Sequence, residues 1–301
     1  MKSLQRVGVL GHPKRPQTEP VTERIINSLQ AHGIHTWSAV AWKPDDIVDH
    51  IEGSDMVVAI GGDGAMFRAA RLCAPYGVPV LGLNMGRLGF LTEIASPDDW
   101  EISLAKVISG DYWVEQRMMI QATVLRNGEA IIYDQALNDL IISGESAGTM
   151  VQLDCYIDGH WATTYNSDAL IISTPTGSTA YALSAGGPIL PPDLTNILIV
   201  PSAAHLSLDR PIVLSEGSQV AVRPSHDNRT AVVATVDGMR LAQIQQDDII
   251  VVAACDYQSR FIRMRDRNYF YRSLLDRLEP RVNRVAPVRT KTLVEIFKEE
   301  E

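Results

Sequence analysis

Cysteine is scarce in this chain, and long apolar runs are absent. The three cysteines, Cys73, Cys155 and Cys255, lie far apart in apolar surroundings and form no C-x-x-C pair. This pattern is typical of reduced core residues in a reducing compartment. No apolar run reaches the roughly 20 residues that span a bilayer, and the first residues carry no cleavage site of a signal peptide. We therefore expect a cytoplasmic protein.

An excess of basic residues is also missing. Lysine and arginine number 27 against 36 aspartates and glutamates, so the formal net charge is −9. Such a charge argues against nucleic acid or an anionic membrane as the main partner. Hydrophobic residues make up 46% of the 301 residues and charged residues 21%, which predicts a globular protein with room for two domains.

Strand and helix patterns alternate in the first third of the chain. We expect strands at residues 6–11, 35–40, 56–59 and 79–83, and helices at 21–32, 45–51 and 65–75. This order predicts a parallel sheet with flanking helices. Ligands of such sheets bind beyond the carboxyl ends of the strands, so the loops at 11–15, 61–64 and 84–91 should converge on one crevice. Its candidate cations, each of which alone is more typical of a solvated surface, are Lys14, Arg15, Arg68 and Arg87.

From about residue 117 the pattern changes to short strands. Hairpin turns are predicted at Asn127-Gly128, Asp158-Gly159 and Asp237-Gly238. Strands are expected at residues 121–125, 130–142, 151–157, 169–173, 196–200, 219–223, 231–236 and 247–254, which favours a β-sandwich-like domain. We predict an α/β domain at 1–117, a mainly β domain at 118–265, and a helical tail at 266–301 that packs back on the N-terminal domain.

A glycine-rich turn joins the apolar run 56–59 to the helix that follows it. Residues 60–64 are Ile-Gly-Gly-Asp-Gly, in which the glycines allow close approach of a ligand and the helix N-terminus favours an anion such as phosphate. Asp63 adds a negative charge, which indicates a general base or an acceptor for a hydroxyl. The alternative is a structural turn with Asp63 as helix N-cap. Phe67 replaces the third glycine of a dinucleotide fingerprint and no Walker lysine follows, so neither common phosphate loop is present.

Two polar patches interrupt the β-rich half. Asn138 and Asp139 lie side by side within an apolar run, where they could hold the edge of a base and a sugar hydroxyl; taken alone, a turn or bulge is the favoured interpretation. Residues 172–188 are rich in small and hydroxyl side chains and contain Tyr181. This composition suits a polar ligand that lies against the backbone with an aromatic ring packed on it, and a plain loop between strands is the alternative.

Taken together, these segments resemble the bacterial NAD kinase family. The resemblance rests on Gly-Gly-Asp-Gly at 61–64, Asn-Met-Gly-Arg-Leu-Gly-Phe-Leu at 84–91, Asn-Asp at 138–139, Thr-Pro-Thr-Gly-Ser-Thr-Ala-Tyr at 174–181, Ala-Gly-Gly-Pro at 185–188 and Leu-Ser-Leu-Asp-Arg-Pro-Ile at 206–212. It implies transfer of a phosphoryl group from ATP, or another donor, to the 2′-hydroxyl of the adenosine ribose of NAD, giving NADP. It also implies a divalent cation, usually Mg²⁺, an active site between the two domains, and a homodimer or homotetramer.

The resemblance assigns roles residue by residue. Asp63 is the expected proton acceptor from the ribose hydroxyl. The matched NAD-binding positions are Asp63, Gly64, Arg68, Asn138, Asp139, Asp168, Thr179, Ala180, Tyr181, Ala182, Leu183, Ser184 and Ala203.

The chain departs from the family pattern at several of these motifs. Ala65 stands where the family has threonine, Asn166 where a basic residue is common, and Met239 where glutamine is common. Ser-Asp-Ala at 167–169 replaces Gly-Asp-Gly, and Ala-Ala-His at 203–205 replaces a segment with proline. These departures leave open a catalytically impaired NAD(H)-binding sensor, and the shared Gly-Gly-Asp-Gly motif leaves open a related kinase for a lipid or sugar. The sequence also leaves open the phosphoryl donor, the choice between NAD and NADH, the oligomeric state and feedback control.

Overall fold

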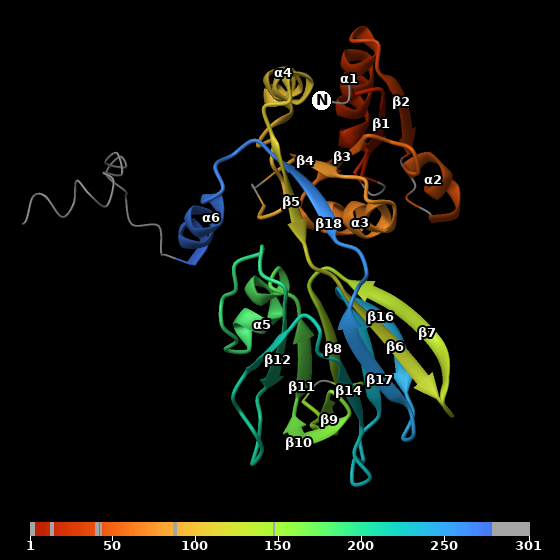
Figure 1. The fold of residues 1–301 in the computed structure, drawn as a ribbon, viewed down its shortest axis with the longest axis vertical. Helices are drawn as coiled ribbons and strands as arrows, with labels where there is room; N and C mark the ends of the chain where they lie inside the picture. Colours follow the sequence, from red (N-terminus) through yellow and green to blue (C-terminus); the bar gives the residue numbers. More distant parts are fainter. Residues whose placement is uncertain are drawn as a thin grey trace, which may run out of the picture. The chain divides into compact units, whose positions relative to one another are not determined.

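The computed structural model describes residues 4–12, 15–39, 42, 44–86, 89–146 and 148–278 (Figure 1). The chain divides into two compact units, residues 1–265 and residues 266–301. Within the second unit the structure describes one helix, α6 (Tyr269–Leu278), as the helical pattern predicted. Among the described residues, none of the helices is both long enough and apolar enough to cross a membrane.

The first sheet has six strands in the order β2-β1-β3-β4-β18-β5. The strands are β1 (Arg6–Leu10), β2 (His35–Ala39), β3 (Met56–Gly61), β4 (Val80–Asn84), β5 (Trp113–Arg117) and β18 (Ser259–Arg263). All neighbours pair in parallel except β5, which runs antiparallel to β18. The prediction of an α/β domain with a parallel sheet is confirmed.

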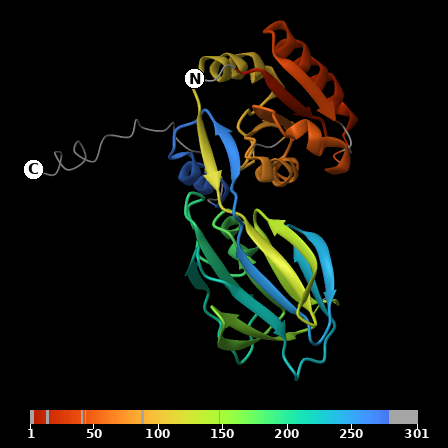
Figure 2. The same ribbon diagram turned by 45° about the vertical axis from the view of Figure 1, so that its right-hand side comes forward.

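Helices cover both faces of this sheet (Figures 1 and 2). They are α1 (Glu19–Ala31), α2 (Pro44–Ile51), α3 (Asp63–Cys73) and α4 (Trp100–Ser109), with 3-10 turns at Pro16–Thr18, Ala74–Tyr76 and Pro97–Asp99. Strand β3 is buried throughout, because Val57 and Ala59 pack in one apolar cluster with α2 and α3 while Val58 and Ile60 pack in another with α1 and α4. Full burial of a valine or isoleucine side chain contributes about 1.5–3 kcal/mol, so Val57, Val58 and Ile60 stabilise the strand that leads into Gly-Gly-Asp-Gly.

Strand β18 corrects the sequence interpretation, which left residues 259–263 inside the β-rich segment. Phe261 pairs with Val80 of β4, and β5 pairs along β18 from Ser259 to Arg263. The chain therefore returns to the first sheet after the β-rich part is complete. The remaining domain boundaries stay a prediction.

Two antiparallel sheets form the β-rich part. One has the order β10-β9-β14-β17-β6-β7, from β6 (Ile120–Arg126), β7 (Glu129–Ala136), β9 (Val151–Ile157), β10 (His160–Ser167), β14 (Val220–Pro224) and β17 (Ile249–Ala254). The other has the order β13-β12-β11-β8-β15-β16, from β8 (Asp139–Gly144), β11 (Ala169–Ser173), β12 (Asn196–Ser202), β13 (Ile212–Ser215), β15 (Val232–Val236) and β16 (Met239–Ile244). A 3-10 turn (Gly177–Thr179) and the short helix α5 (Tyr181–Ser184) follow β11.

One apolar cluster joins the inner faces of these two sheets. Val124 and Val222 from the first sheet share it with Leu140, Ile172 and Ala234 from the second. The predicted β-sandwich is therefore confirmed.

The three predicted hairpins are present, and their turns have the expected backbone. In each turn both residues have positive φ, for example 45° at Asp237 and 79° at Gly238, as two-residue type I′ turns require. The single strand expected at 130–142 is instead two strands, β7 and β8, separated by a turn at Leu137 and Asn138.

Candidate active site

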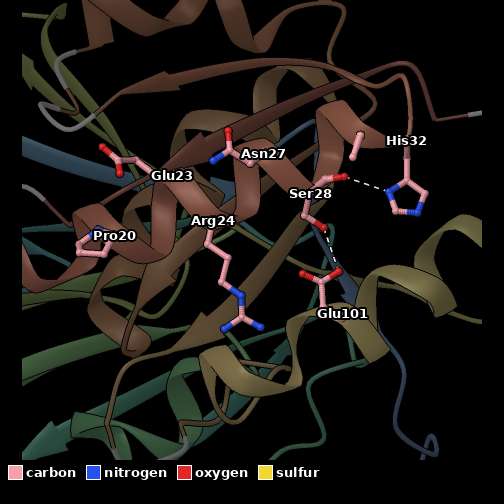
Figure 3. Close-up of a pocket in the computed structure, with 8 residues that line it drawn as sticks. Pro20, Glu23, Arg24, Asn27, Ser28, His32 and Glu101 are labelled. Atoms are coloured by element: carbon pink, nitrogen blue, oxygen red, sulfur yellow. Dashed lines mark hydrogen bonds between the residues drawn. The ribbon is translucent and has the colours of Figure 1, made fainter.

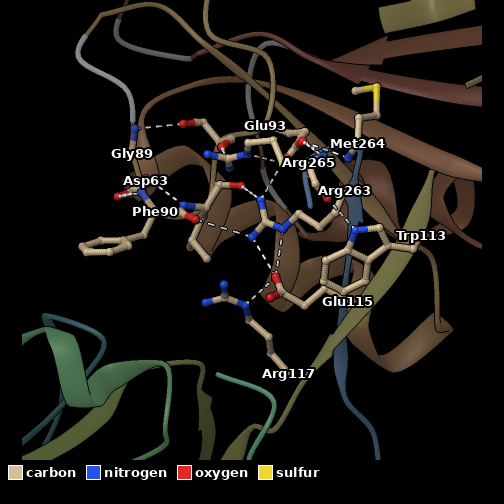
Figure 4. Close-up of polar contacts among 12 residues, drawn as sticks. Asp63, Gly89, Phe90, Glu93, Trp113, Glu115, Arg117, Arg263, Met264 and Arg265 are labelled. Carbon is tan, nitrogen blue, oxygen red and sulfur yellow. Dashed lines mark hydrogen bonds and ion pairs between the residues drawn. The ribbon is translucent and has the colours of Figure 1, made fainter. Parts of the chain in front are cut away.

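Asp63 is the first residue of α3, and its carboxylate is bound by the loop after β4. Oδ2 accepts a hydrogen bond from the Phe90 N–H at 2.9 Å, and Oδ1 accepts one from the Leu91 N–H at 3.0 Å (Figure 4). The helix N-cap is Gly62, without a side-chain capping bond. The N-cap alternative for Asp63 is therefore wrong, and the side chain instead ties the Gly-Gly-Asp-Gly turn to the loop at 84–91.

Gly89 lies against the same carboxylate. A Cβ atom built at this position would be 1.8 Å from Asp63 Oδ1, so no side chain fits here without displacing the carboxylate. The sequence interpretation quoted Gly89 in a motif but gave it no role. The sequence feature that could have indicated this role is a glycine in the loop after a buried strand. Glycine is common at such a position because another chain segment approaches the backbone closely.

The first loop also reaches this place, as predicted. A Cβ at Gly61, where φ is 154°, would lie 3.3 Å from the His12 ring and 2.7 Å from the Ala65 Cβ. Ala65 is 6% exposed and packs in the core cluster of α3. The departure from threonine therefore falls on a buried position beside the glycine turn.

Of the candidate cations, Arg68 is exposed and lies next to Trp42. Its Nη2 donates to the Trp42 carbonyl at 3.3 Å, and its guanidinium carbon is 5.7 Å from the centre of the indole ring. Trp42 in turn donates from Nε1 to the Gly11 carbonyl at 2.5 Å. Arg68 is thus anchored beside the first loop. Lys14 and Arg87 lie outside the described residues.

The second group of predicted residues surrounds the turn between β7 and β8. The Asp237 carboxylate, at the tip of the β15–β16 hairpin, accepts from the N–H groups of Leu137, Asn138 and Asp139 at 2.9, 2.8 and 3.2 Å. These bonds explain why the expected single strand breaks here. Asp237 holds this turn in place, a role that the sequence did not predict, since its only signal was the Asp-Gly hairpin.

Asp139 is buried, and the half-buried Asp237 acts on it through its charge. Burial, with a further contribution from the charge of Asp237, raises the pKa of Asp139 to about 7. Burial also raises the pKa of Asp237, although its three peptide N–H bonds and the charge of Arg71 oppose the shift. Asp139 is therefore a carboxyl group that exchanges its proton near neutral pH.

The segment after β11 packs on Asn138. The Asn138 carbonyl accepts from the Thr174 N–H at 2.8 Å and from Ser173 Oγ at 3.1 Å. A Cβ at Gly177 would lie 2.2 Å from that carbonyl oxygen. The Asn-Asp pair thus meets the threonine-rich motif through the backbone carbonyl of Asn138.

The 3-10 turn and α5 present the remainder of that motif. Thr179 Oγ1 donates to the Thr176 carbonyl at 3.2 Å, which closes the turn. Ala182 is buried, whereas Tyr181 is 43% exposed. Ala180 and Leu183 are half-buried and Ser184 is exposed. Tyr181 is therefore available to pack on a ligand.

Asp168 and Ala203 come together at the end of the β11–β12 pair. The Asp168 N–H donates to the Ser202 carbonyl at 3.0 Å, and both Asp168 and Ala203 are exposed. Ala203 has a φ of 51°, and the His205 N–H donates to the Asn166 carbonyl at 2.8 Å. The departures at 166–169 and 203–205 therefore form one local cluster.

A hollow between α1 and α4 contains none of the predicted residues (Figure 3). Its volume is about 580 Å³, and Ser28 Oγ donates to Glu101 Oε2 at 3.0 Å at its wall. It is lined by Pro20, Glu23, Arg24, Asn27, Ser28, Ala31, His32 and Glu101. We assign it no part in the site.

Comparisons with known proteins agree with the motifs. The family models described as ATP-NAD kinase N-terminal domain and ATP-NAD kinase C-terminal domain match residues 13–112 and 137–264. An NAD kinase of Pseudomonas fluorescens (strain SBW25) is 44% identical over 248 residues, which are 82% of this chain and 81% of the relative. An NAD kinase of Thermoanaerobacter sp. (strain X514) is 35% identical over 275 residues, 89% of this chain and 96% of the relative.

Solved structures share the fold. Yeast NADH kinase complexed with NADH has a TM-score of 0.80 at 24% identity and covers 92% of this chain and 88% of its own. An NAD kinase from Archaeoglobus fulgidus in complex with ATP has a TM-score of 0.70 at 23% identity, covering 90% and 98%. On the strength of the sequence relatives, this chain belongs to the NAD kinase family and is a phosphotransferase.

Proposed function

We propose that this chain transfers the terminal phosphoryl group of ATP to the 2′-hydroxyl of the adenosine ribose of NAD. The proposal rests on Asp63, the first residue of α3. Its carboxylate accepts hydrogen bonds from the peptide N–H groups of Phe90 and Leu91. A ribose hydroxyl is a poor nucleophile at neutral pH, and a positioned carboxylate that accepts its proton is a common remedy. Family membership supports the substrates, as do the NADH and ATP bound to the yeast and Archaeoglobus relatives.

In the proposed reaction the 2′-oxygen attacks the γ-phosphorus of ATP while its proton passes to Asp63. The bond between the γ-phosphorus and the bridging oxygen breaks, and the products are NADP and ADP. The N-terminus of α3 presents peptide N–H groups and the positive end of its dipole to the phosphates. Arg68, exposed on the same helix, offsets further negative charge in the transition state.

We assign the dinucleotide to the groups around Asn138. Asn138 and Asp139 would hold the adenosine, and residues 179–184 would wrap the dinucleotide with the Tyr181 ring packed on it. Asp168 and Ala203 would contact the same ligand from the end of β11 and β12. The support is that Asn138 contacts the threonine-rich segment directly and that Asp168 and Ala203 share one exposed cluster.

A divalent cation, which we take to be Mg²⁺, would supply charge compensation for the phosphates when bound. Among the residues with known placement, no three or more His, Cys, Asp or Glu side chains group as metal ligands. Mg²⁺ sites of phosphoryl-transfer enzymes often use one or two carboxylates together with substrate phosphates and water. The described residues fit a cation held mainly by the substrate phosphates and water, since Asp63 already accepts two peptide N–H groups and is assigned the ribose proton.

We also propose a homo-oligomer, a dimer or tetramer, in the cytoplasm. The family resemblance supports the assembly, and the three free thiols, Cys73, Cys155 and Cys255, are in keeping with a reducing compartment. Light scattering of the purified protein measures the assembly directly.

The reaction is tested by product analysis. Purified protein receives NAD or NADH with Mg²⁺ and either ATP or polyphosphate, and the dinucleotide product is identified by mass and by its reaction with an NADP-specific dehydrogenase. NADP formation supports the proposal and identifies the donor. Saturable NAD binding without NADP under any donor would favour the sensor, and phosphorylation of a lipid or sugar instead would favour the related kinase.

A further inference from the structure

A buried group of charged residues lies directly behind the loop that binds Asp63 (Figure 4). It consists of Arg263 at 0% exposure, Arg117 at 3%, Glu115 at 4% and Glu93 at 8%, and we call it the Arg263 cluster. Arg265 Nε pairs with Glu93 Oε2 at 3.0 Å from a partly exposed position. Burying four charged side chains carries a large desolvation cost, and pairs of this kind need not stabilise a fold more than apolar residues would.

Arg263 contacts the two residues that bind Asp63. Its Nη1 donates to the Leu91 carbonyl at 2.8 Å, and its Nη2 lies 3.5 Å from the Phe90 carbonyl oxygen. Its Nε donates to Glu115 Oε2 at 2.8 Å, which fixes the plane of the guanidinium. Arg263 is the last residue of β18. A strand about 170 residues after Leu91 in the chain therefore supports the loop that binds Asp63.

One peptide group lies between Arg263 and Asp63 and contacts both side chains. The peptide between Phe90 and Leu91 gives its N–H to Asp63 Oδ1 and turns its C=O toward Arg263. A trans peptide is planar, and its N–H and C=O point in opposite directions. Arg263 therefore holds this peptide on both sides, by the 2.8 Å bond to the Leu91 carbonyl that follows it and by the 3.5 Å contact with the Phe90 carbonyl, and so restricts the N–H that orients the carboxylate.

The Arg263 cluster also extends to the threonine-rich motif. Glu115 Oε2 accepts from Arg117 Nε at 3.0 Å as well as from Arg263. Arg117 Nη1 in turn donates to Thr176 Oγ1 at 3.4 Å. The buried carboxylate of Glu115 thus links Arg263 to the threonine-rich motif, at a position just before the residues 179–184 that we assign to the dinucleotide.

We propose that Arg263 is a positioning residue, which orients the Asp63 carboxylate through the peptide between Phe90 and Leu91, with Glu115 holding Arg263 in place. This proposal rests on the proposed function, because it takes Asp63 as the proton acceptor. It assigns Arg263 no contact with either substrate. Its loss therefore slows the chemical step and leaves NAD binding nearly intact.

The test uses Arg263→Lys, which keeps the charge and removes the planar fork of donors. Glu115→Gln is the second variant in case Arg263→Lys folds poorly. Arg126→Lys is the matched control, since Arg126 makes two 2.8 Å bonds to Asp248 in the sandwich and has no side-chain hydrogen bond to a proposed site residue within the described part of the chain. We expect Arg263→Lys to lower kcat by about tenfold or more with KM for NAD changed by less than about threefold, as for a group that acts mainly in the transition state. Glu115→Gln should show a smaller effect in the same direction, and Arg126→Lys should leave kcat unchanged.

A double-mutant cycle with Asp63→Asn separates positioning from general stability. If Arg263 acts through Asp63, Arg263→Lys should not slow the residual rate of the Asp63→Asn enzyme further. An equal loss in both backgrounds would overturn the proposal, as would a rise in KM without a loss of kcat.

Hydrogen exchange of the Phe90 and Leu91 amides gives a readout that needs no activity. Arg263→Lys should accelerate their exchange by about tenfold or more, because the loop loses its support, while Arg126→Lys should not. Unchanged exchange would overturn the positioning role even in an active enzyme. Absence of NADP formation by the wild type would overturn the proposed function instead, and the exchange result would still decide whether Arg263 holds the loop.

Discussion

Gly89 approaches the Asp63 carboxylate so closely that an added Cβ would lie 1.8 Å from Oδ1. Gly89→Ala should therefore push the carboxylate out of place while adding only one methyl group. We expect kcat to fall by about 100-fold, which is the scale of a misplacement of about 1 Å at a reacting group. Steady-state kinetics checks this, with Gly217→Ala as control because a Cβ there would meet no described residue within 4 Å other than its chain neighbours. Wild-type kcat in Gly89→Ala would show that the carboxylate need not stay where it is.

Gly177 has the corresponding relationship to Asn138. Its Cβ would lie 2.2 Å from the Asn138 carbonyl oxygen, so Gly177→Ala should move Asn138 and the threonine-rich segment apart. Since we assign these groups to NAD binding, we expect KM for NAD to rise by about tenfold with a smaller change in kcat. Isothermal titration with NAD measures the same loss at equilibrium. A large fall in kcat with unchanged NAD affinity would contradict the assignment.

Asp139 predicts a pH dependence of stability. Its pKa of about 7 in the folded protein lies above the ordinary value of about 4. Between about pH 4 and pH 7, the folded protein therefore keeps a proton on Asp139 that the unfolded chain has released. Stability should therefore fall as the pH rises through this window. Asp139→Asn removes the titration, and from about pH 5 to about pH 8 the wild type should lose about 2–3 kcal/mol of unfolding free energy relative to the variant.

Urea unfolding of both proteins across that pH range checks this expectation. The difference in unfolding free energy between the wild type and Asp139→Asn should change in favour of the variant as the pH rises. If the unfolding free energies of the two proteins instead change in parallel from about pH 5 to about pH 8, Asp139 does not titrate in this range in the folded protein, and the expectation is wrong.

The sequence predicted the elements whose signals are local. The β and α patterns of the first third, and the three Asn-Gly or Asp-Gly hairpins, each depend on a few neighbouring residues, and all are present in the fold. Strand β18 was missed because its partners β4 and β5 lie far away in the chain. Its residue Arg263 is fully buried, whereas an arginine in a sequence ordinarily indicates an exposed side chain.

For the candidate site, the sequence predicted the position of Asp63 but not the groups that bind it. The motif at 61–64 placed Asp63 at a turn after a buried strand, which the structure confirms. The partners of Asp63, the peptide N–H groups of Phe90 and Leu91, could not be predicted. Nearly every residue carries a peptide N–H, so the sequence does not indicate which of them binds the carboxylate. Likewise, the break between β7 and β8 depends on Asp237, about 100 residues later in the chain.

If Asp63 accepts the proton of the ribose hydroxyl, the Asp63→Asn variant should lose the chemical step. The amide keeps the size of the side chain but is a far weaker base, so kcat for NADP formation should fall by about 1,000-fold or more, within the range of general base catalysis. NAD affinity should stay within roughly tenfold of the wild type, as for a group that acts mainly in the transition state. An Asp63→Asn enzyme that forms NADP at the wild-type rate would contradict the account.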